Sequence, residues 1–136
     1  MFNSLKDIIE KLQNSGISWV IQKYMEHPLL YKKRKLDIRQ WVLVTSINPL
    51  NIWFYEKCYI RLTHSEYTLN NIKNRFAHLT NNSVNKYAEN FDEENSFLSQ
   101  NQFQIYLKEK FPKEKTPFKK IQNQMKEQVR MAMSCG

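Results

Sequence analysis

Three charged residues at alternating positions, Lys35, Asp37 and Arg39, are the side chains in this sequence best suited to do chemistry. On an extended strand, side chains alternate between the two faces, so these three are expected to point to the same side. An ammonium, a carboxylate and a guanidinium that converge beside buried structure can hold ribose hydroxyls and phosphates. A cross-strand ion pair at a sheet edge is the competing explanation, and in an arbitrary protein it is the more frequent one.

A long β-hairpin is predicted to position these charges. Residues 36–46 and 51–62 are rich in branched and aromatic residues, and Asn48–Asn51 supplies turn chemistry between them. The Glu56-Lys57 pair interrupts the second arm, which predicts a bulge or a short tip there. Trp41–Val44 is apolar at four consecutive positions, so we expect this part of the hairpin to enter a sheet that is covered on both faces. The charged end of the strand is then expected to lie at the rim of that sheet.

A helix and a strand are predicted ahead of the hairpin. Residues 2–13 place apolar side chains at helical spacing, and Asn14–Gly16 supplies a stop. Residues 19–25 favour a strand that Pro28 ends. The basic run Lys32–Lys35 follows, and a solvated connection between two strands explains it as well as a binding role does.

The second half of the chain is predicted to contain two helices that follow a polar loop. His78–Ser83 shows neither a helical nor a strand period and is expected to be that loop. Ser99 and Gln102 have the spacing of a capping box, which predicts a helix that closes near Phe111. Thr116-Pro117 predicts the start of another helix. Its buried stripe is expected to comprise Phe118, Ile121, Met125, Val129 and Met133.

The composition indicates one basic, globular domain. The chain has 136 residues and a formal net charge of +8, with a sequence pI near 9.5. This charge favours an anionic partner such as nucleic acid, a nucleotide, an acidic protein tail or a membrane surface, without choosing among them. Residues 1–13 are too charged for a signal sequence, and no apolar stretch is long enough to cross a bilayer, so a soluble protein is expected.

Metal binding by histidine and covalent catalysis find no support in the sequence. His27, His64 and His78 are widely separated, and none pairs with another ligand at a metal-binding spacing. Cys58 and Cys135 match no paired-cysteine spacing, which argues against a disulfide scaffold or a zinc site and favours a reducing, intracellular setting. Serine and cysteine residues lack a recognisable nucleophile elbow or a partnered base. The acidic run from residue 92 to residue 94 has no base beside it and is expected to be a solvated loop.

Binding of single-stranded nucleic acid is a minor alternative, because aromatic faces stack bases and cations follow phosphates. The strand patterns instead favour a core role for most of the aromatic residues concerned, and no aromatic signature of an RNA-binding module accompanies them. These residues are Trp19, Trp41, Trp53, Phe54, Tyr55 and Tyr59.

Three further features together favour a nucleotide cleft over an isolated ion pair. An extended segment ends in Gln22–Met25, Arg61 lies near the end of the hairpin, and Thr80-Asn81 belongs to the polar segment. No one of these features suffices, but their combination is what a nucleotide cleft would need.

Three segments together resemble the tubulin tyrosine ligase-like family in order and spacing. They are Trp19-Val20-Ile21-Gln22-Lys23-Tyr24, Lys35-Leu36-Asp37-Ile38-Arg39-Gln40-Trp41-Val42-Leu43-Val44 and His78-Leu79-Thr80-Asn81-Asn82-Ser83. Residues 48–55 and 99–107 resemble most closely the branch that adds glycine to tubulin. The resemblance implies an α+β fold, a partial ATP-grasp domain with a mostly antiparallel sheet, a central β-hairpin and flanking helices, formed by residues 1–136 as a single unit.

The resemblance also implies a reaction and a set of site residues. Such an enzyme uses ATP to phosphorylate a carboxylate, and the amino group of glycine then attacks the acyl phosphate to form an amide bond with tubulin. The enzyme supplies position and charge neutralisation. By matching position, Gln22, Lys23, Tyr24 and Met25 correspond to the hinge segment that contacts adenine, and Lys35 and Asp37 correspond to the pair beside the ribose. Arg39 and Arg61 correspond to the arginines at the phosphate and acceptor end. Thr80 and Asn81 match residues that line the same cleft.

The partners implied by the resemblance are acidic tubulin tails or microtubules and free glycine, in the cytoplasm, the cytoskeleton or the axoneme of a cilium or flagellum. Family members carry phosphate-binding lysines before the matching region, and an Asp and a Glu-x-Asn that hold magnesium after it. The resemblance therefore implies ATP and magnesium as cofactors. This sequence contains neither set, so we expect the metal ligands to lie outside the chain and the isolated chain to be inactive or very weak. The alternatives are a noncatalytic basic module that binds tubulin and a nucleic-acid-binding domain.

Overall fold

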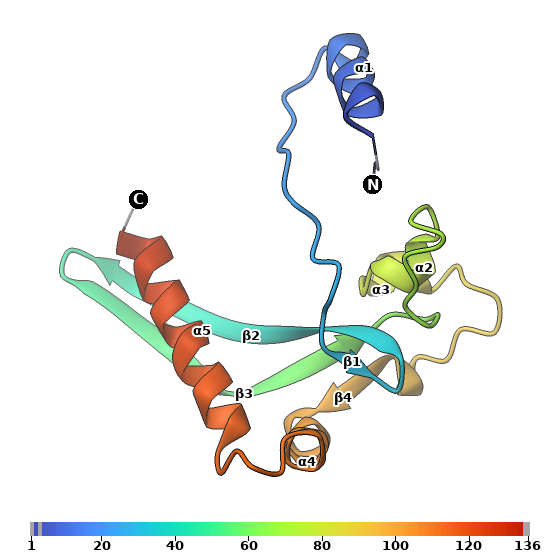
Figure 1. The fold of residues 1–136 in the computed structure, drawn as a ribbon. Helices are drawn as coiled ribbons and strands as arrows, with labels where there is room; N and C mark the ends of the chain where they lie inside the picture. Colours follow the sequence, from blue (N-terminus) through green and yellow to red (C-terminus); the bar gives the residue numbers. More distant parts are fainter. Residues whose placement is uncertain (1, 3, 135–136) are drawn as a thin grey trace.

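A four-stranded antiparallel sheet in the order β1-β2-β3-β4 forms the centre of the protein, in a computed structural model that describes residue 2 and residues 4–134 (Figure 1). The strands are β1 (Leu30–Tyr31), β2 (Arg34–Ile47), β3 (Leu50–Leu62) and β4 (Phe97–Ser99). The helices are α1 (Leu5–Ser15), α2 (Arg75–His78), α3 (Asn82–Asn85), a 3₁₀ turn at Glu94–Ser96, α4 (Gln100–Lys110) and α5 (Pro117–Ser134). This arrangement confirms the predicted α+β class, the antiparallel sheet and the central hairpin.

The β2–β3 hairpin is the longest element of the fold, and its register sets which residues meet across it. Leu36 pairs with Leu62, and the pairing continues in step to Gln40 and Cys58. The next pair joins Val42 to Phe54, so three residues of β3 lie opposite a single residue of β2. This is a bulge at residues 55–57, where the interruption at Glu56-Lys57 predicted one.

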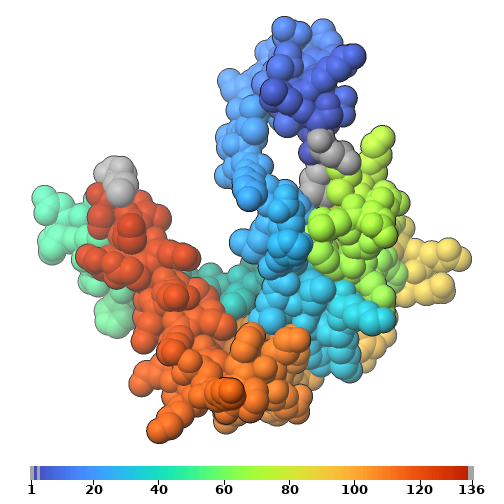
Figure 2. Space-filling model, in the orientation of Figure 1, coloured from blue at the N-terminus to red at the C-terminus, as the bar shows by residue number. Residues whose placement is uncertain are grey.

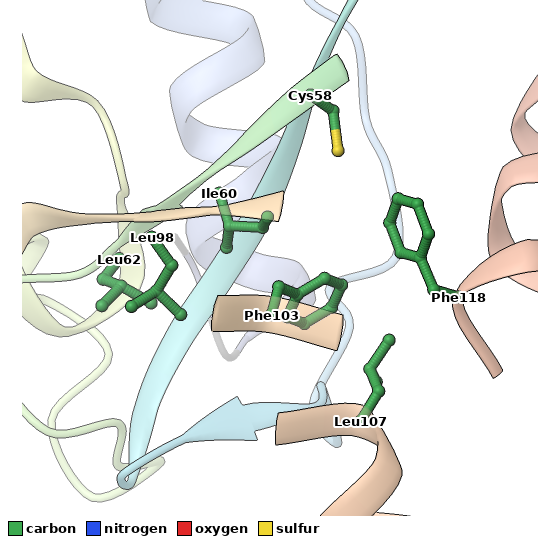
Figure 3. Close-up of a cluster of buried hydrophobic side chains, with 7 residues drawn as sticks. All are labelled: Cys58, Ile60, Leu62, Leu98, Phe103, Leu107 and Phe118. Atoms are coloured by element: carbon green, nitrogen blue, oxygen red, sulfur yellow. The ribbon is translucent and has the colours of Figure 1, made fainter. Parts of the chain in front are cut away.

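The hydrophobic core lies at the base of the hairpin, between β3 and the C-terminal helices (Figure 3). Alternate residues of β3 point to one face, where they meet side chains from β4, α4 and α5. The Phe103 and Phe118 rings pack edge to face at a centroid distance of 6.3 Å. Burial of each large apolar side chain contributes about 2 kcal/mol to stability. The core consists of Cys58, Ile60, Leu62, Leu98, Phe103, Leu107 and Phe118.

The two C-terminal helices begin where the sequence predicts. The Ser99 side chain accepts from the Gln102 backbone N–H and the Gln102 side chain accepts from the Ser99 backbone N–H, which completes the capping box of α4. The predicted stripe of α5 is buried or half-buried from Phe118 to Val129. The prediction for Met133 is wrong, because its side chain is 43% exposed, and the whole last turn of α5, residues 131–134, is exposed with it.

The N-terminal helix is confirmed, but the strand predicted after it is wrong. Ser4 caps α1, and Gly16 ends it at φ 60°, a left-handed conformation that glycine adopts without strain. Residues 19–25 are extended without pairing to any described strand, and Val20 is 82% exposed. Branched and aromatic composition favours a strand only where a hydrogen-bonding neighbour exists. Here the short strand β1 occupies the edge of the sheet beside β2 instead.

The polar segment predicted as a loop is partly helical. The one-turn helix α2 ends at His78 and the one-turn helix α3 begins at Asn82, so only residues 79–81 form the connection. The Asn74 side chain accepts from the Phe76 backbone N–H and starts α2. A helix of four residues is too short to show a hydrophobic period, which explains the error. The acidic residues 92–94 are exposed as expected, with the last of them starting the 3₁₀ turn.

The outer half of the hairpin is covered on one face only, so the prediction of a sheet covered on both faces is wrong. Helix α5 covers the face that carries Phe54, whose ring lies 5.4 Å from the Lys126 ammonium. On the other face, Trp41 is 68% exposed and Trp53 62% exposed. Most of the aromatic residues predicted as core are therefore at the surface: Trp19, Trp41, Trp53, Tyr55 and Tyr59 are exposed and Phe54 is half-buried. The sequence pattern correctly predicts which side chains share a face of the strand, but it does not show whether a second layer covers that face.

No helix within the described residues is both long enough and apolar enough to cross a membrane.

Candidate functional site

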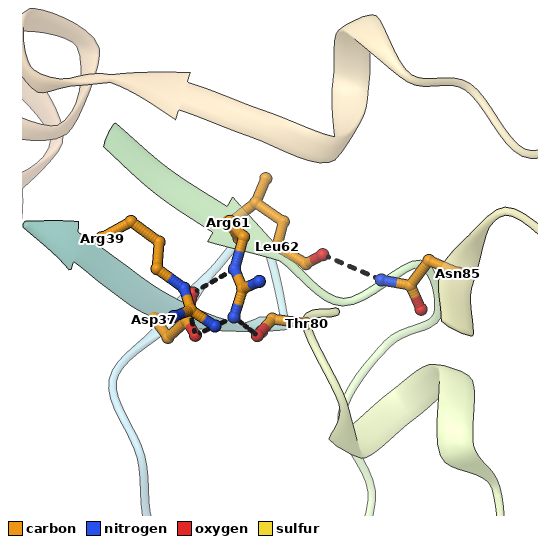
Figure 4. A network of polar contacts seen from close by, with 6 residues as sticks. All are labelled: Asp37, Arg39, Arg61, Leu62, Thr80 and Asn85. Carbon is orange, nitrogen blue, oxygen red and sulfur yellow. Dashed lines mark hydrogen bonds and ion pairs between the residues drawn. The ribbon is translucent and has the colours of Figure 1, made fainter. Parts of the chain in front are cut away.

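Asp37 and Arg61 form the centre of a polar cluster at the base of the hairpin (Figure 4). They are direct partners in the β2–β3 register. Arg61 donates from Nε to Asp37 Oδ1 at 2.9 Å and from Nη2 to Asp37 Oδ2 at 2.6 Å. Its Nη2 also donates to the Thr80 hydroxyl at 3.3 Å, and Arg39 Nε lies 3.7 Å from Asp37 Oδ2. The predicted cross-strand ion pair and the predicted convergence of charges are therefore both present.

The electrostatics of this cluster keep both central groups ionised. Burial raises the pKa of the Asp37 carboxyl, but hydrogen bonds and charge from Arg61 outweigh burial, so the pKa lies below its ordinary value. The hydrogen bond to Asp37 raises the pKa of Arg61. The side chain of Arg61 is only 16% exposed, whereas that of Arg39 is 46% exposed. Arg61 is thus held in a fixed orientation, and Arg39 remains accessible to an anion.

Lys35 lies on the same strand and contacts the extended segment rather than Asp37. Its Nζ donates to the Tyr24 hydroxyl at 2.9 Å and lies 4.4 Å from the centre of the Tyr24 ring. Burial lowers the pKa of Lys35 and raises the pKa of Tyr24. The structure therefore connects the strand that carries the charges to the segment that contains Gln22–Met25.

A largely apolar cavity of about 720 Å³ adjoins this contact. Gln22, Lys23 and Tyr24 line it on one side and α1 lines it on the other, whereas Met25 is 68% exposed and does not line it. Figure 2 shows α1 standing apart from the body of the molecule, with a hollow beneath it. Its volume is within the range of cavities that hold small-molecule ligands.

The polar segment contributes two residues that differ in exposure. Thr80 is buried at 8% exposure and contacts Arg61, while Asn81 is exposed and its side chain does not cap α3. Two further residues of this region were not predicted as site residues. His78 is buried and bonds to the Tyr24 hydroxyl, and Asn85 donates to the Leu62 carbonyl oxygen at 3.3 Å. The Asn85 Oδ1 atom, also buried, has no hydrogen-bond partner among the described residues.

The basic run divides between the turn and the site. Lys32 and Lys33 form the exposed β1–β2 turn, where Lys33 lies 3.6 Å from Glu66. Arg34 points back into the fold, since its guanidinium donates to the Thr63 and Asn95 carbonyl oxygens. Lys35 points to the opposite face of the strand and contacts Tyr24. The alternation of the strand explains the division.

The described residues do not offer a metal site. Within residues 4–134, no three His, Cys, Asp or Glu side chains gather where they could hold an ion. Both oxygens of Asp37 are already bonded to Arg61. The thiol of Cys58 is free and buried, and burial raises its pKa; Cys135, the other cysteine of the sequence, lies outside the described residues.

Comparison with known proteins agrees with the resemblance seen in the sequence. The model of the "Tubulin-tyrosine ligase family" matches residues 1–135. Tubulin glycylase 3B of Tetrahymena thermophila is 46% identical over 110 residues, which is 79% of this chain and 9% of that protein. Human tubulin monoglycylase TTLL3 is 44% identical over 97 residues, 67% of this chain and 12% of its own. The chain spans about a tenth of the length of the curated relatives it matches.

Proposed function

The chain belongs to the tubulin-tyrosine ligase family, and we propose that the protein containing it is an ATP-dependent ligase that joins glycine to tubulin through an amide bond. The relatives named above are a tubulin glycylase and a tubulin monoglycylase, which supports glycine as the donor and tubulin as the acceptor. In this proposal, residues 1–136 form the central part of one ATP-grasp domain. The protein then acts on the cytoskeleton, including the microtubules of cilia or flagella.

The observation that carries the proposal is that Lys35, on the same strand as Asp37 and Arg39, contacts Tyr24 in the wall of an apolar cavity. Adenine occupies the cavity against Gln22, Lys23 and Tyr24, because an apolar wall and backbone polar groups suit a purine. The ribose lies beside Lys35 and Asp37. The phosphates then reach the exposed guanidinium of Arg39, with the Arg61 fork oriented behind it by Asp37. Thr80 and Asn81 border the same end of the cleft.

The reaction that this geometry supports is acyl activation followed by amide formation. A glutamate carboxylate of the tubulin tail attacks the terminal phosphorus of ATP, and ADP leaves. The amino group of glycine then attacks the acyl phosphate carbon, a C–N bond forms, the C–O bond to phosphate breaks, and the amine loses a proton. The arginines neutralise the transferred phosphoryl group and hold it in line.

Magnesium chemistry is not assigned to these residues. Asp37 is the carboxylate at the cluster and Arg61 already holds both of its oxygens, so the described residues do not fit a divalent ion. The cationic side chains of the cluster instead contribute charge that complements phosphate and an acidic tubulin tail. The formal net charge of +8 supports attraction of that tail as well.

Incorporation of labelled glycine into tubulin tests this function. The full-length protein is incubated with tubulin, ATP, magnesium and either labelled glycine or labelled glutamate. The proposal expects label from glycine, ATP-dependent and stable to hydroxylamine, which cleaves esters and thioesters but not amides. Label from glutamate alone would contradict glycine as the donor, and no label from either would contradict ligase activity.

A noncatalytic tubulin-binding module is the second candidate, favoured by the basic charge together with the exposed aromatic face of the hairpin. Such a module would bind tubulin in a salt-sensitive way and gain no protection against heating from ATP. A thermal shift with ATP in the presence and absence of tubulin therefore separates the two functions. Competition with RNA in the same assay addresses nucleic-acid binding.

A further inference from the structure

His78 has a defined hydrogen-bonding direction, because its two ring nitrogens face different partners. The residue is 3% exposed. Its Nε2 lies 3.1 Å from the Asn71 carbonyl oxygen, which can only accept a hydrogen bond. In the neutral tautomer that fits both partners, the proton is on Nε2, and Nδ1 accepts from the Tyr24 hydroxyl at 2.8 Å.

This direction fixes the Tyr24 hydroxyl in turn. Because the Tyr24 hydroxyl donates its proton to His78, its oxygen is an acceptor for the Lys35 ammonium, which donates at 2.9 Å. A one-way chain of three hydrogen bonds thus runs from Lys35 through Tyr24 and His78 to the Asn71 carbonyl oxygen. Chains of this kind polarise each other and are stronger in a partly buried site than in water.

The chain matters because the segment carrying Tyr24 is not part of the sheet. Residues 19–25 pair with no described strand, so side-chain contacts must hold them. Tyr67 adds a second contact by donating to the Glu26 carbonyl oxygen at 2.7 Å, and its ring packs edge to face on His78 at 5.4 Å. His78 therefore contacts both tyrosines that connect this segment to the body.

We propose that His78 is a positioning residue: through Tyr24 it holds the 19–25 segment and the Lys35 ammonium in place for the purine and ribose of a nucleoside triphosphate. The proposal rests on the proposed function for its ligand, but the hydrogen-bond chain itself does not. It differs from a packing role, in which the imidazole only fills space beside Ala77 and the tyrosine rings. The two roles predict opposite orders for two substitutions.

His78→Asn keeps an acceptor near the position of Nδ1 but loses volume, and His78→Leu keeps the volume but removes the acceptor. Positioning predicts that His78→Asn retains function and His78→Leu loses it, while packing predicts the reverse. Tyr24→Phe removes the hydroxyl without a cavity and should match His78→Leu. Tyr87→Phe is the control, because Tyr87 is 75% exposed and lies outside the chain of hydrogen bonds.

The first measurement needs no nucleotide. Backbone ¹⁵N order parameters of residues 22–25 in this 136-residue chain should be near the ~0.85 of rigid backbone in the wild type and in His78→Asn. They should fall toward ~0.6 in His78→Leu and in Tyr24→Phe. Unchanged order parameters in both of these variants would overturn the proposal, and so would ¹⁵N shifts that place the His78 proton on Nδ1.

The second measurement is the ATP affinity of the full-length protein. It should weaken about tenfold in both variants, since Tyr24→Phe removes the hydrogen bond from the Lys35 ammonium and His78→Leu leaves the Tyr24 hydroxyl that accepts this bond unoriented. The double variant should weaken no more than either single one, because both break the same chain. Additive losses, or a weaker His78→Asn than His78→Leu, would overturn positioning. If the wild type binds no ATP, the proposed function fails, and the order parameters alone decide whether His78 holds the segment.

Discussion

Arg61 and Asp37 face each other across the β2–β3 ladder and are joined by two parallel hydrogen bonds of 2.9 and 2.6 Å. This geometry orients the guanidinium before any ligand arrives, which reduces the ordering that a bound phosphate would require. It also makes the pair a structural link between the two longest strands. Its contribution to stability and its proposed contribution to catalysis can be separated by substitution.

The stability of the fold should depend on this pair. Asp37→Asn removes the charge and one of the two good acceptors, so we expect a loss of about 1 kcal/mol in the free energy of unfolding, discounted for the 38% exposure of Asp37. Urea unfolding of the 136-residue chain measures it. Glu127→Gln is the control, because it removes an exposed pair within α5 and should leave the urea midpoint unchanged. Equal effects of the two substitutions would contradict the role of the Asp37–Arg61 pair.

The same pair predicts a pH dependence with a definite sign. The pKa of Asp37 is lower in the folded chain than in the unfolded chain, so the unfolded state takes up the proton first as the pH falls. The stabilisation is present in full above the unfolded pKa of about 4 and is lost as the pH falls through the lower, folded pKa. The difference in unfolding free energy between wild type and Asp37→Asn should therefore shrink below about pH 4. A difference that stays constant down to pH 2 or grows on acidification would contradict the assigned shift.

For catalysis, the planar guanidinium of Arg61, with its two parallel donors, should matter more than the charge of the residue. Arg61→Lys keeps the charge but cannot make two parallel bonds, so we expect kcat/KM for glycine incorporation by the full-length protein to fall by about 100-fold. Arg130→Lys on the exposed surface of α5 is the matched control and should change kcat/KM less than twofold. If Arg61→Lys keeps full activity, a point charge suffices and the fork has no catalytic role.

The exposed aromatic face of the hairpin should contribute little to stability compared with the core. Trp41→Ala removes a side chain that is 68% exposed, so we expect it to cost less than about 1 kcal/mol. Phe103→Ala empties a fully buried position and should cost about 3–5 kcal/mol. Thermal or urea unfolding of both variants checks the order. A large cost for Trp41→Ala would mean that a second layer covers this face in solution.

Local sequence signals predicted the elements that depend on neighbouring residues. The capping box at Ser99, the proline start of α5 and the β2–β3 hairpin with its bulge all follow from spacing and residue type within a few positions. The strand predicted at residues 19–25 failed because strand formation needs a hydrogen-bonding neighbour that composition does not report. Burial of Trp41 failed for a similar reason, since alternation shows the two faces but not what covers them.

The contacts among the candidate site residues do not follow from the sequence. Asp37 and Arg61 were placed in one cleft, yet their direct pairing follows from the register of the hairpin and was not assigned from the sequence. The bond between Tyr24 and His78 joins residues 54 positions apart, a separation at which no sequence period carries information. The burial of His78 between the rings of Tyr24 and Tyr67 likewise depends on the tertiary fold, because the sequence shows only that His78 has no metal-binding partner nearby.

The central claim is that the cavity beside Tyr24 and the charges around Asp37 form one ATP site, and photolabelling tests it most directly. The full-length protein is irradiated with 8-azido-ATP, digested, and the labelled peptide is identified by mass spectrometry. We predict label on residues 22–25, abolished by excess ATP and reduced about tenfold in Lys35→Ala, which loses a charged partner at the ribose. ATP-protected label on the exposed aromatic face of the hairpin, or on no part of residues 1–136, would contradict the account.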